Sequence, residues 1–265
     1  MAFFKTSDGV SINYQVHQGN DQGKTALLLA GFSGIQAEWQ YQIETLKAQG
    51  FCVVTMDWRS HGRSARTSKN LRISRLAADL KELIDRLNLS DLLVIGHSMG
   101  AAVIWAYLSL FGEAAFRQAV FIDQSPKLLN DETWTAGLLG LNWTSFPVLS
   151  ETFFHQKMTV APVSQAFKDK LKQEKIDYPF DFDLAFPLLK DHLLSDWREN
   201  LSACGLAKLF VAGGASPLWK HQYYHDFLDD LKGGQELVVI PGTGHLPHLE
   251  KPEKFSTILH DFVTK

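Results

Sequence analysis

Six short runs of apolar residues constrain the fold of this chain more than any other feature of its sequence. Each run is continuous rather than alternating and ends at or near Gly, Asp or Ser, which is typical of strands buried on both faces of a parallel sheet. The runs lie at residues 25–32, 51–58, 91–98, 118–123, 207–214 and 236–242. A further segment, residues 9–17, alternates apolar and polar positions and predicts an antiparallel edge strand.

Segments with helical periodicity separate these runs. In residues 72–88 the apolar side chains of Ile73, Leu76 and Leu80 recur on one side of the predicted helix. Further helices are predicted at residues 100–112, 221–232 and 252–264. Strands that alternate with helices predict an α/β fold with a mostly parallel, doubly wound sheet.

Residues 126–200 interrupt this alternation. They contain no convincing buried strand but many aromatic residues and several short helical patterns. We therefore predict a helical cap at residues 126–200, inserted after the strand that ends at Asp123. Residues 1–125 and 201–265 would then form the α/β core.

Composition excludes several classes of function. The formal net charge is −3 and 21% of the residues are charged, so no basic face for nucleic acid is expected. No signal peptide or membrane-spanning run is recognisable, which predicts a cytoplasmic protein with no membrane partner. Cys52 and Cys204 are expected to be buried thiols, and no residue cluster has metal-ligand spacing, so neither a metal nor another cofactor is expected. The oligomeric state stays open.

The pentapeptide GHSMG, residues 96–100, lies between a predicted strand and a predicted helix. A serine on such a sharp turn needs small residues two positions before and after it, which Gly96 and Gly100 provide. The start of the helix then directs backbone N–H groups toward a developing oxyanion. The pattern predicts Ser98 as a nucleophile and His97 as a structural residue whose side chain points away from the attacking side.

Two histidines, His245 and His248, follow the last apolar run in the stretch PGTGHLPHLEKPEKF. Loops at the carboxyl ends of parallel strands are where open α/β sheets bind their ligands. Gly244 gives His245 a loop freedom that His248 lacks, so His245 is the candidate general base. An imidazole there can accept the serine proton and return it near neutral pH.

Four stretches of the sequence resemble motifs of the α/β-hydrolase superfamily, and the resemblance covers nearly the whole chain. They are AGFSGIQAEW at 30–39, DWRSHGRS at 57–64, GHSMG at 96–100 and GTGHLPHLEKPEKF at 242–255. The resemblance implies the doubly wound fold and a triad in the chain order serine, acid, histidine. In the second stretch Ser60 stands where the family usually has glycine, and Asp57, Arg59 and Gly62 are expected to be scaffold residues.

The same resemblance assigns an oxyanion hole to two backbone N–H groups, those of Phe32 and Met99. The family commonly has His-Gly after its first core strand, whereas this chain has Ala30-Gly31. Backbone donors do not depend on side-chain identity, so the hole is expected to survive this change.

The acid departs from the family's common pattern. It usually follows the strand that corresponds to residues 207–214, but Ser216 stands there. A variant arrangement in the family places the acid one strand earlier, and the strand at 118–123 ends in Asp123. Neighbouring parallel strands end on one rim, so the resemblance implies Asp123 as the acid. The alternatives are a turn or capping role for Asp123 and a His245 with no acidic partner.

The stretch FIDQSPKLLND, residues 121–131, resembles a branch that contains cofactor-free haloperoxidases, esterases and lactonases. This resemblance implies a serine hydrolase that cleaves a small, apolar carboxylic ester or lactone through an acyl-enzyme. The aromatic residues of the cap suggest an apolar pocket, although they also suit a core of the cap itself. The tryptophans expected to face Ser98 are Trp39, Trp134, Trp143 and Trp219.

Three alternatives remain open. In perhydrolysis, or haloperoxidase-type activity, peroxide replaces water as the attacker of the same acyl-enzyme. A cofactor-independent dioxygenase of quinolone-type rings shares the fold and the acid position, but that group tends to have histidine where this chain has Met99. A non-catalytic ligand sensor on the same fold would not need both Ser98 and His245.

Overall fold

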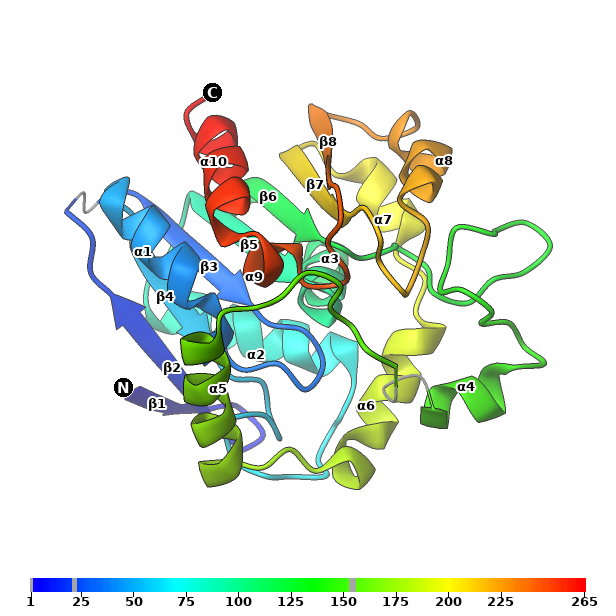
Figure 1. The fold of residues 1–265 in the computed structure, drawn as a ribbon. Helices are drawn as coiled ribbons and strands as arrows, with labels where there is room; N and C mark the ends of the chain where they lie inside the picture. Colours follow the sequence, from blue (N-terminus) through cyan, green and yellow to red (C-terminus); the bar gives the residue numbers. More distant parts are fainter. Residues whose placement is uncertain (1, 21–22, 153–155) are drawn as a thin grey trace.

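A sheet of eight strands forms the centre of the computed structural model, which describes residues 2–20, 23–152 and 156–265 (Figure 1). The strands in sequence order are β1 (Ala2–Lys5), β2 (Ser11–His17), β3 (Thr25–Leu29), β4 (Cys52–Met56), β5 (Leu92–His97), β6 (Phe116–Ile122), β7 (Ala207–Gly213) and β8 (Gln235–Ile240). Their order across the sheet is β1-β2-β4-β3-β5-β6-β7-β8. The strands from β3 to β8 pair in parallel, which confirms the predicted class of sheet.

The antiparallel edge differs from the prediction in one respect. β2 pairs antiparallel with β4 as expected, but β1 pairs antiparallel with β2 and takes the edge position. In β1 the side chain of Phe4 is buried whereas that of Phe3 is exposed. A strand of four residues has too short an alternation to be recognised from the sequence, so β1 was not predicted.

Helices cover both faces of the sheet, as a doubly wound fold requires (Figure 1). One face packs against α2 (Ile73–Arg86) and α3 (Met99–Phe111), whose apolar residues join the larger core cluster. The other face packs against α1 (Gln40–Ala48) and α10 (Pro252–Val263). The short helices of the core are η1 (Gln36–Trp39), η3 (His221–Tyr224), α8 (His225–Leu228) and α9 (Pro247–Glu250).

The helix predicted at 221–232 is therefore shorter than expected. It forms as η3 followed by α8 and ends at Leu228. The carbonyl of Leu228 accepts hydrogen bonds from the backbone N–H of Leu231 and from the side chain of Gln235. Gly233, with φ of 76°, then turns the chain into β8.

Residues 126–200 contribute helices and, within the described residues, no strand of the central sheet. An irregular segment at 126–145 leads into α4 (Phe146–Thr152), α5 (Gln165–Asp177), α6 (Phe182–Leu194) and α7 (Arg198–Ala203). We propose that residues 126–200 form a cap on the core, which consists of residues 1–125 and 201–265. Residues 153–155 of this predicted cap lie outside the described residues.

Ion pairs and hydrogen bonds connect the cap to the core. The guanidinium of Arg63 contacts both carboxylate oxygens of Glu174 on α5 at 2.9 Å and donates to the hydroxyl of Tyr178 at 2.9 Å. Asp191 on α6 accepts from the backbone N–H of Ile73 at 2.8 Å. The helices of the cap are thus held at two places on the core.

The turn at residues 57–64 has a structural role, as predicted. Asp57 accepts hydrogen bonds from the backbone N–H groups of Gln36 and Arg63 at 2.8 and 3.0 Å. A Cβ on Gly62, whose φ is 46°, would lie 2.4 Å from the Asp57 carboxylate. The cysteines are free, and Cys52 is partly exposed rather than buried as expected. No helix among the described residues has both the length and the apolar character needed to cross a bilayer.

Candidate active site

Ser98 lies on a strained turn between β5 and α3. Its backbone has φ of 52° and ψ of −123°, a conformation that L-residues rarely adopt. The backbone N–H of Ser98 donates to the carbonyl of Ile122 on β6 at 3.0 Å, which ties the turn to the next strand. The hydroxyl makes no hydrogen bond to any described residue, and it lines a cavity together with His245.

The glycines on either side of Ser98 are required by close backbone contacts. A Cβ on Gly100 would lie 2.2 Å from the carbonyl oxygen of Leu29, and a Cβ on Gly96 would lie 2.6 Å from the backbone nitrogen of Ala101. Both distances are far below van der Waals contact. The structure thus supplies the physical reason for the small residues in the GHSMG turn.

His245 and Asp123 are in direct contact. Nδ1 of His245 lies 2.8 Å from Oδ2 of Asp123, and the carboxylate is completely buried. Asp123 follows β6 directly and has φ of 45°, a left-handed conformation that Asp tolerates better than most residues. Its backbone N–H donates to Val211 on β7 at 2.8 Å, so the residue is anchored between two strands.

Two groups, one at the end of β7 and one on the loop after it, also hydrogen-bond to this carboxylate. The hydroxyl of Ser216 donates to Oδ2 at 2.7 Å, and the backbone N–H of Gly213 donates to Oδ1 at 2.8 Å. A Cβ on Gly213 would lie 1.8 Å from the carbonyl oxygen of Gly244, the residue before the histidine. The glycine therefore allows the end of β7, which hydrogen-bonds to the acid, to touch the loop that holds His245.

The loop after β3 lies against the serine. A Cβ on Gly31 would be 3.1 Å from the Cβ of Ser98, so the backbone of Phe32 is next to the nucleophile candidate. The indole N–H of Trp58 donates to the carbonyl of Ala30 at 2.8 Å and anchors this loop without the histidine that the family commonly has. Met99 is the first residue of α3, where backbone N–H groups have no partner within the helix.

His97 and His248 are packed close to His245, and His97 also lines the cavity around Ser98, which differs from the prediction that its side chain points away from the attacking side. Nε2 of His97 lies 2.8 Å from the carbonyl oxygen of His245, and the rings of His97 and His248 are 4.7 Å apart. His248 is fully buried and stacks on Trp39 with ring centroids 5.0 Å apart. Burial lowers the pKa of His248 to about 3 and that of His97 well below its usual value, with His245 adding to both shifts. Both rings are therefore neutral and fit a structural role.

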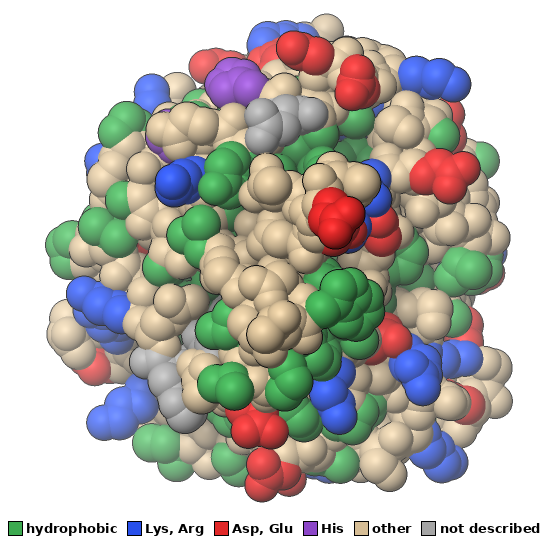
Figure 2. Space-filling view, turned by 90° about the vertical axis from the view of Figure 1, so that its right-hand side faces the viewer, with side chains coloured by type: hydrophobic (Ala, Val, Ile, Leu, Met, Phe, Trp, Pro, Cys, Tyr) green, Lys and Arg blue, Asp and Glu red, His purple; other side chains and the backbone are tan. Residues whose placement is uncertain are grey.

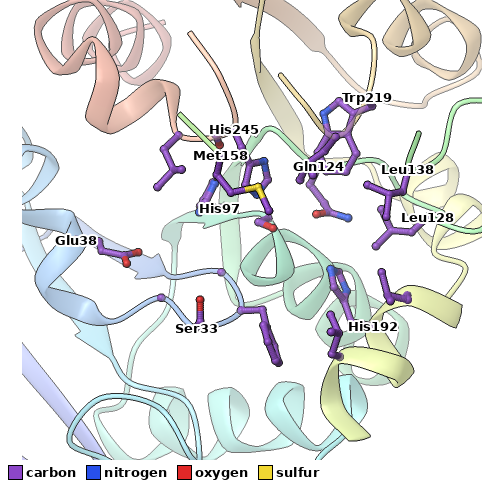
Figure 3. A pocket seen from close by; sticks show the side chains of 18 of the residues that line it. Ser33, Glu38, His97, Gln124, Leu128, Leu138, Met158, His192, Trp219 and His245 are labelled. Atoms are coloured by element: carbon purple, nitrogen blue, oxygen red, sulfur yellow. The ribbon is translucent and has the colours of Figure 1, made fainter. Parts of the chain in front are cut away.

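The cavity around Ser98 has a volume of about 230 Å³ and lies between the core and the cap (Figure 3). Figure 3 shows Ser33 and Glu38 on one side of it and Leu128, Leu138 and His192 on the other. Burial raises the pKa of the Glu38 carboxyl, and Lys175 lies 3.8 Å from it.

Only one of the four predicted tryptophans is brought to this cavity. Trp219 lines it, with its ring 5.7 Å from that of His245. Trp39 is buried against His248, and Trp134 packs on Phe227 at 5.9 Å. Trp143 is 69% exposed. Figure 2 shows the side of the molecule on which α4 lies, where hydrophobic side chains are exposed at several places. The prediction that all four would surround Ser98 is corrected for Trp39, Trp134 and Trp143, whose positions depend on long-range packing.

Glu250 was not identified from the sequence. Its carboxylate accepts from the backbone N–H groups of Gly244 at 2.9 Å, Val160 at 2.8 Å and Ala161 at 2.7 Å. The backbone N–H of His245 donates to the carbonyl of Met158 at 2.7 Å. The loop of His245 is thus bound directly to the cap segment 158–161. The only sequence signal that Glu250 connects this loop to the cap is its position five residues after His245 in GHLPHLE.

The sequence of the chain matches one protein family along most of its length. Residues 26–258 match the family described as "Alpha/beta hydrolase family". A "3-oxoadipate enol-lactonase 1" from Acinetobacter baylyi is 26% identical over 232 residues, which cover 85% of this chain and 83% of that protein.

Solved structures show the same fold. A bromoperoxidase from Bacillus anthracis superimposes with a TM-score of 0.87 at 20% identity and covers 100% of this chain and 99% of its own. An esterase from Exiguobacterium antarcticum gives a TM-score of 0.87 at 18% identity, with the same coverage of both chains. At these identities the likeness speaks for the fold, and the chemistry has to be argued from the site.

Proposed function

Because the chain belongs to the alpha/beta hydrolase family, we propose that it is a serine hydrolase that cleaves a small carboxylic ester or lactone. The observation that carries this proposal is the 2.8 Å contact between His245 and Asp123 at the cavity that Ser98 also lines. The enol-lactonase and the esterase among the similar proteins support the substrate class. The apolar residues of the cavity suit an apolar acyl or alcohol group.

In the proposed mechanism Oγ of Ser98 attacks the carbonyl carbon while Nε2 of His245 accepts the hydroxyl proton. Asp123 accepts the hydrogen bond from Nδ1–H, which fixes the tautomer and stabilises the imidazolium that forms. The tetrahedral intermediate collapses, and the leaving alkoxide receives the proton from His245. Water then attacks the acyl-enzyme by the same route and releases the carboxylic acid.

The oxyanion of each tetrahedral intermediate would be held by the backbone N–H groups of Phe32 and Met99. The position of the Gly31 backbone against Ser98 and the start of α3 at Met99 support this assignment. The same acyl-enzyme would also accept peroxide in place of water. Sequence similarity to a "Putative non-heme chloroperoxidase" from Synechocystis, 23% identical over 256 residues, favours this second candidate activity, which needs no residue beyond those already named.

Labelling with a fluorophosphonate probe, followed by a screen of short esters and lactones, tests the proposal. We expect the wild-type protein to be labelled and the Ser98→Ala variant to lose both the label and about a thousandfold or more in kcat. Full labelling of Ser98→Ala would refute the assignment of the nucleophile. Oxygen uptake with a hydroxyquinolone that persists in Ser98→Ala would support the dioxygenase instead.

A further inference from the structure

One side of the cavity around Ser98 is mostly apolar but carries the polar side chains of Gln124 and His192, together with the indole N–H of Trp219. Gln124 directly follows Asp123, and His192 lies on α6 of the cap. Figure 3 shows both side chains on the side of Leu128 and Leu138, away from Ser33 and Glu38. The apolar side chains that line the cavity include those of Leu128, Leu138, Leu189, Leu193 and Leu218, and the ring of Trp219.

Both polar side chains are almost completely buried, with exposures of 1% for Gln124 and 5% for His192. Neither Oε1 of Gln124 nor Nδ1 of His192 has a hydrogen-bond partner among the described residues. Nε2 of Gln124 donates to the carbonyl of Ser125 at 2.9 Å, so the amide is oriented with its oxygen as the unsatisfied atom. A buried polar atom left without a partner is unfavourable, and a suitable ligand group would remove this penalty.

The charge state of His192 restricts what this ligand group can be. Burial and the nearby His245 lower the pKa of His192 to about 3, so its ring is neutral at physiological pH. A neutral imidazole has one N–H donor and one acceptor nitrogen, whereas the amide oxygen of Gln124 only accepts. Lys175 also lines the cavity, and its ammonium lies 3.8 Å from Glu38, which Figure 3 shows on the opposite side.

A hydroxyl group meets both requirements at once. It can donate to Oε1 of Gln124 and accept from the N–H of His192, whereas a ketone oxygen can only accept and would leave Oε1 unpaired. We propose that Gln124 and His192 form a subsite for a hydroxyl group on the otherwise apolar chain that fills this side of the cavity. The preferred substrates are then esters that carry a hydroxyl on the acyl or the alcohol chain.

This inference rests on the proposed ester hydrolysis and is tested with a matched series of esters. The series is butyl butanoate, butyl 3-hydroxybutanoate, butyl 3-oxobutanoate and 3-hydroxybutyl butanoate, with kcat and KM measured by acid release. We expect one of the two hydroxyl esters to exceed both the parent and the ketone in kcat/KM by about tenfold or more, mainly through a lower KM. Which hydroxyl ester is preferred shows whether the acyl or the alcohol chain occupies the subsite.

Equal kcat/KM values for the hydroxyl esters and the parent would overturn the subsite and leave the hydrolase assignment standing. Failure to hydrolyse any ester in the series or in the wider screen, together with an unlabelled Ser98, would instead overturn the proposed function. The wild-type series alone therefore separates the two failures.

Variants of Gln124 and His192 then test whether these two side chains cause the preference for hydroxyl esters. Gln124→Met and His192→Phe keep the approximate size of each side chain and remove its hydrogen bonds, so the hydroxyl-to-parent ratio of kcat/KM should fall to within about threefold of unity. His192→Gln, which retains a donor and an acceptor, should restore part of the ratio. His260→Leu, at an exposed position on α10, is the matched control and should retain the wild-type ratio. A ratio that stays at the wild-type value in folded Gln124→Met and His192→Phe would overturn the proposal.

Discussion

The hydroxyl of Ser216 donates a hydrogen bond to Oδ2 of Asp123 at 2.7 Å, and the same carboxylate oxygen lies 2.8 Å from Nδ1 of His245. Ser216 stands where the family commonly has its acid, on the loop after β7, whereas Asp123 follows β6. The serine therefore supports a carboxylate that comes from the neighbouring strand. The fully buried carboxylate of Asp123 thus has three hydrogen-bonding neighbours: the hydroxyl of Ser216, the N–H of Gly213 and the ring of His245.

Asp123→Asn should lower kcat by about a hundredfold to ten-thousandfold, with a smaller change in KM. An asparagine amide cannot stabilise the imidazolium, and it can stabilise the wrong tautomer of His245. Steady-state kinetics on a short ester measures the effect, and thermal unfolding shows whether the fold is retained. Activity within a factor of three of the wild type would remove Asp123 from the mechanism.

The double variant Asp123→Asn/Ser216→Asp is the informative companion to this change. It moves the carboxylate from position 123 to position 216, which is where the family commonly has its acid. We expect it to recover about tenfold or more of the kcat lost in Asp123→Asn, because an acid on either neighbouring strand can reach the same imidazole. An activity no higher than that of Asp123→Asn would show that the two positions are not interchangeable in this chain.

Ser216→Ala should have a milder effect, with kcat lowered by about tenfold. A hydrogen bond to a charged group contributes about 1.5–3 kcal/mol, but Asp123 keeps its contacts with Gly213 and His245. The rate of phosphonate labelling of Ser98 gives a second measurement of the same effect. Ser216→Thr, which retains the hydroxyl, serves as the control and should stay close to wild-type activity.

Stability should fall as the pH falls below about 6.5, in part because His248 is buried in its neutral form. Burial and His245 lower the pKa of native His248 to about 3, while the unfolded chain binds a proton with its ordinary affinity. The unfolded state thus binds more protons in this range, and the stabilisation present above about pH 6.5 is lost progressively toward pH 3.

Urea unfolding of wild type and His248→Leu at about pH 7.5 and pH 5.5 measures this contribution. One such histidine accounts for about 1.4 kcal/mol of the stability lost between these pH values, and the variant should lose that much less. His260→Leu, exposed on α10, should retain the wild-type pH dependence. If His248→Leu lost as much stability as wild type between the two pH values, this explanation would be wrong.

Arg59→Met should destabilise the fold by about 3–5 kcal/mol, because it leaves the buried carboxylate of Asp79 with too few partners. The guanidinium of Arg59 contacts Asp79 at 2.7 and 2.8 Å and Asp8 at 2.9 Å, and Asp79 is fully buried. Chemical denaturation measures the change in unfolding free energy. Arg86→Met, at an exposed position near the end of α2, is the matched control and should change stability by less than about 0.5 kcal/mol.

The sequence allowed the parallel part of the fold to be predicted because its signals are local. Each of the six apolar runs forms a strand, from β3 to β8, and the helices at 72–88, 100–112 and 252–264 also form. The GHSMG turn is equally local, since its glycines avoid contacts with backbone atoms nearby. β1 has only four residues, and the helix at 221–232 ends early through a contact with Gln235, so neither was predicted correctly.

The surroundings of Ser98 were less predictable because they depend on how the cap lies on the core. Tryptophans were expected there as a class, yet Trp39 packs below His248 and Trp143 is exposed. Gln124 and His192, which line the cavity, come from different elements and carry no local pattern that links them. The catalytic roles of Ser98, His245, Asp123, Phe32 and Met99 stay predictions, and the variants above test those of Ser98 and Asp123 directly.

Glu250 accepts hydrogen bonds from Gly244, Val160 and Ala161 and so connects the loop of His245 to the cap segment 158–161. A movement of this cap segment away from the core would therefore also move the imidazole of His245 away from Asp123. The proposed catalytic contact would then be broken whenever the cap opened for substrate entry or product release. Substitutions that loosen the contact between Glu250 and segment 158–161 to speed ligand exchange should therefore also lower the rate of the chemical step.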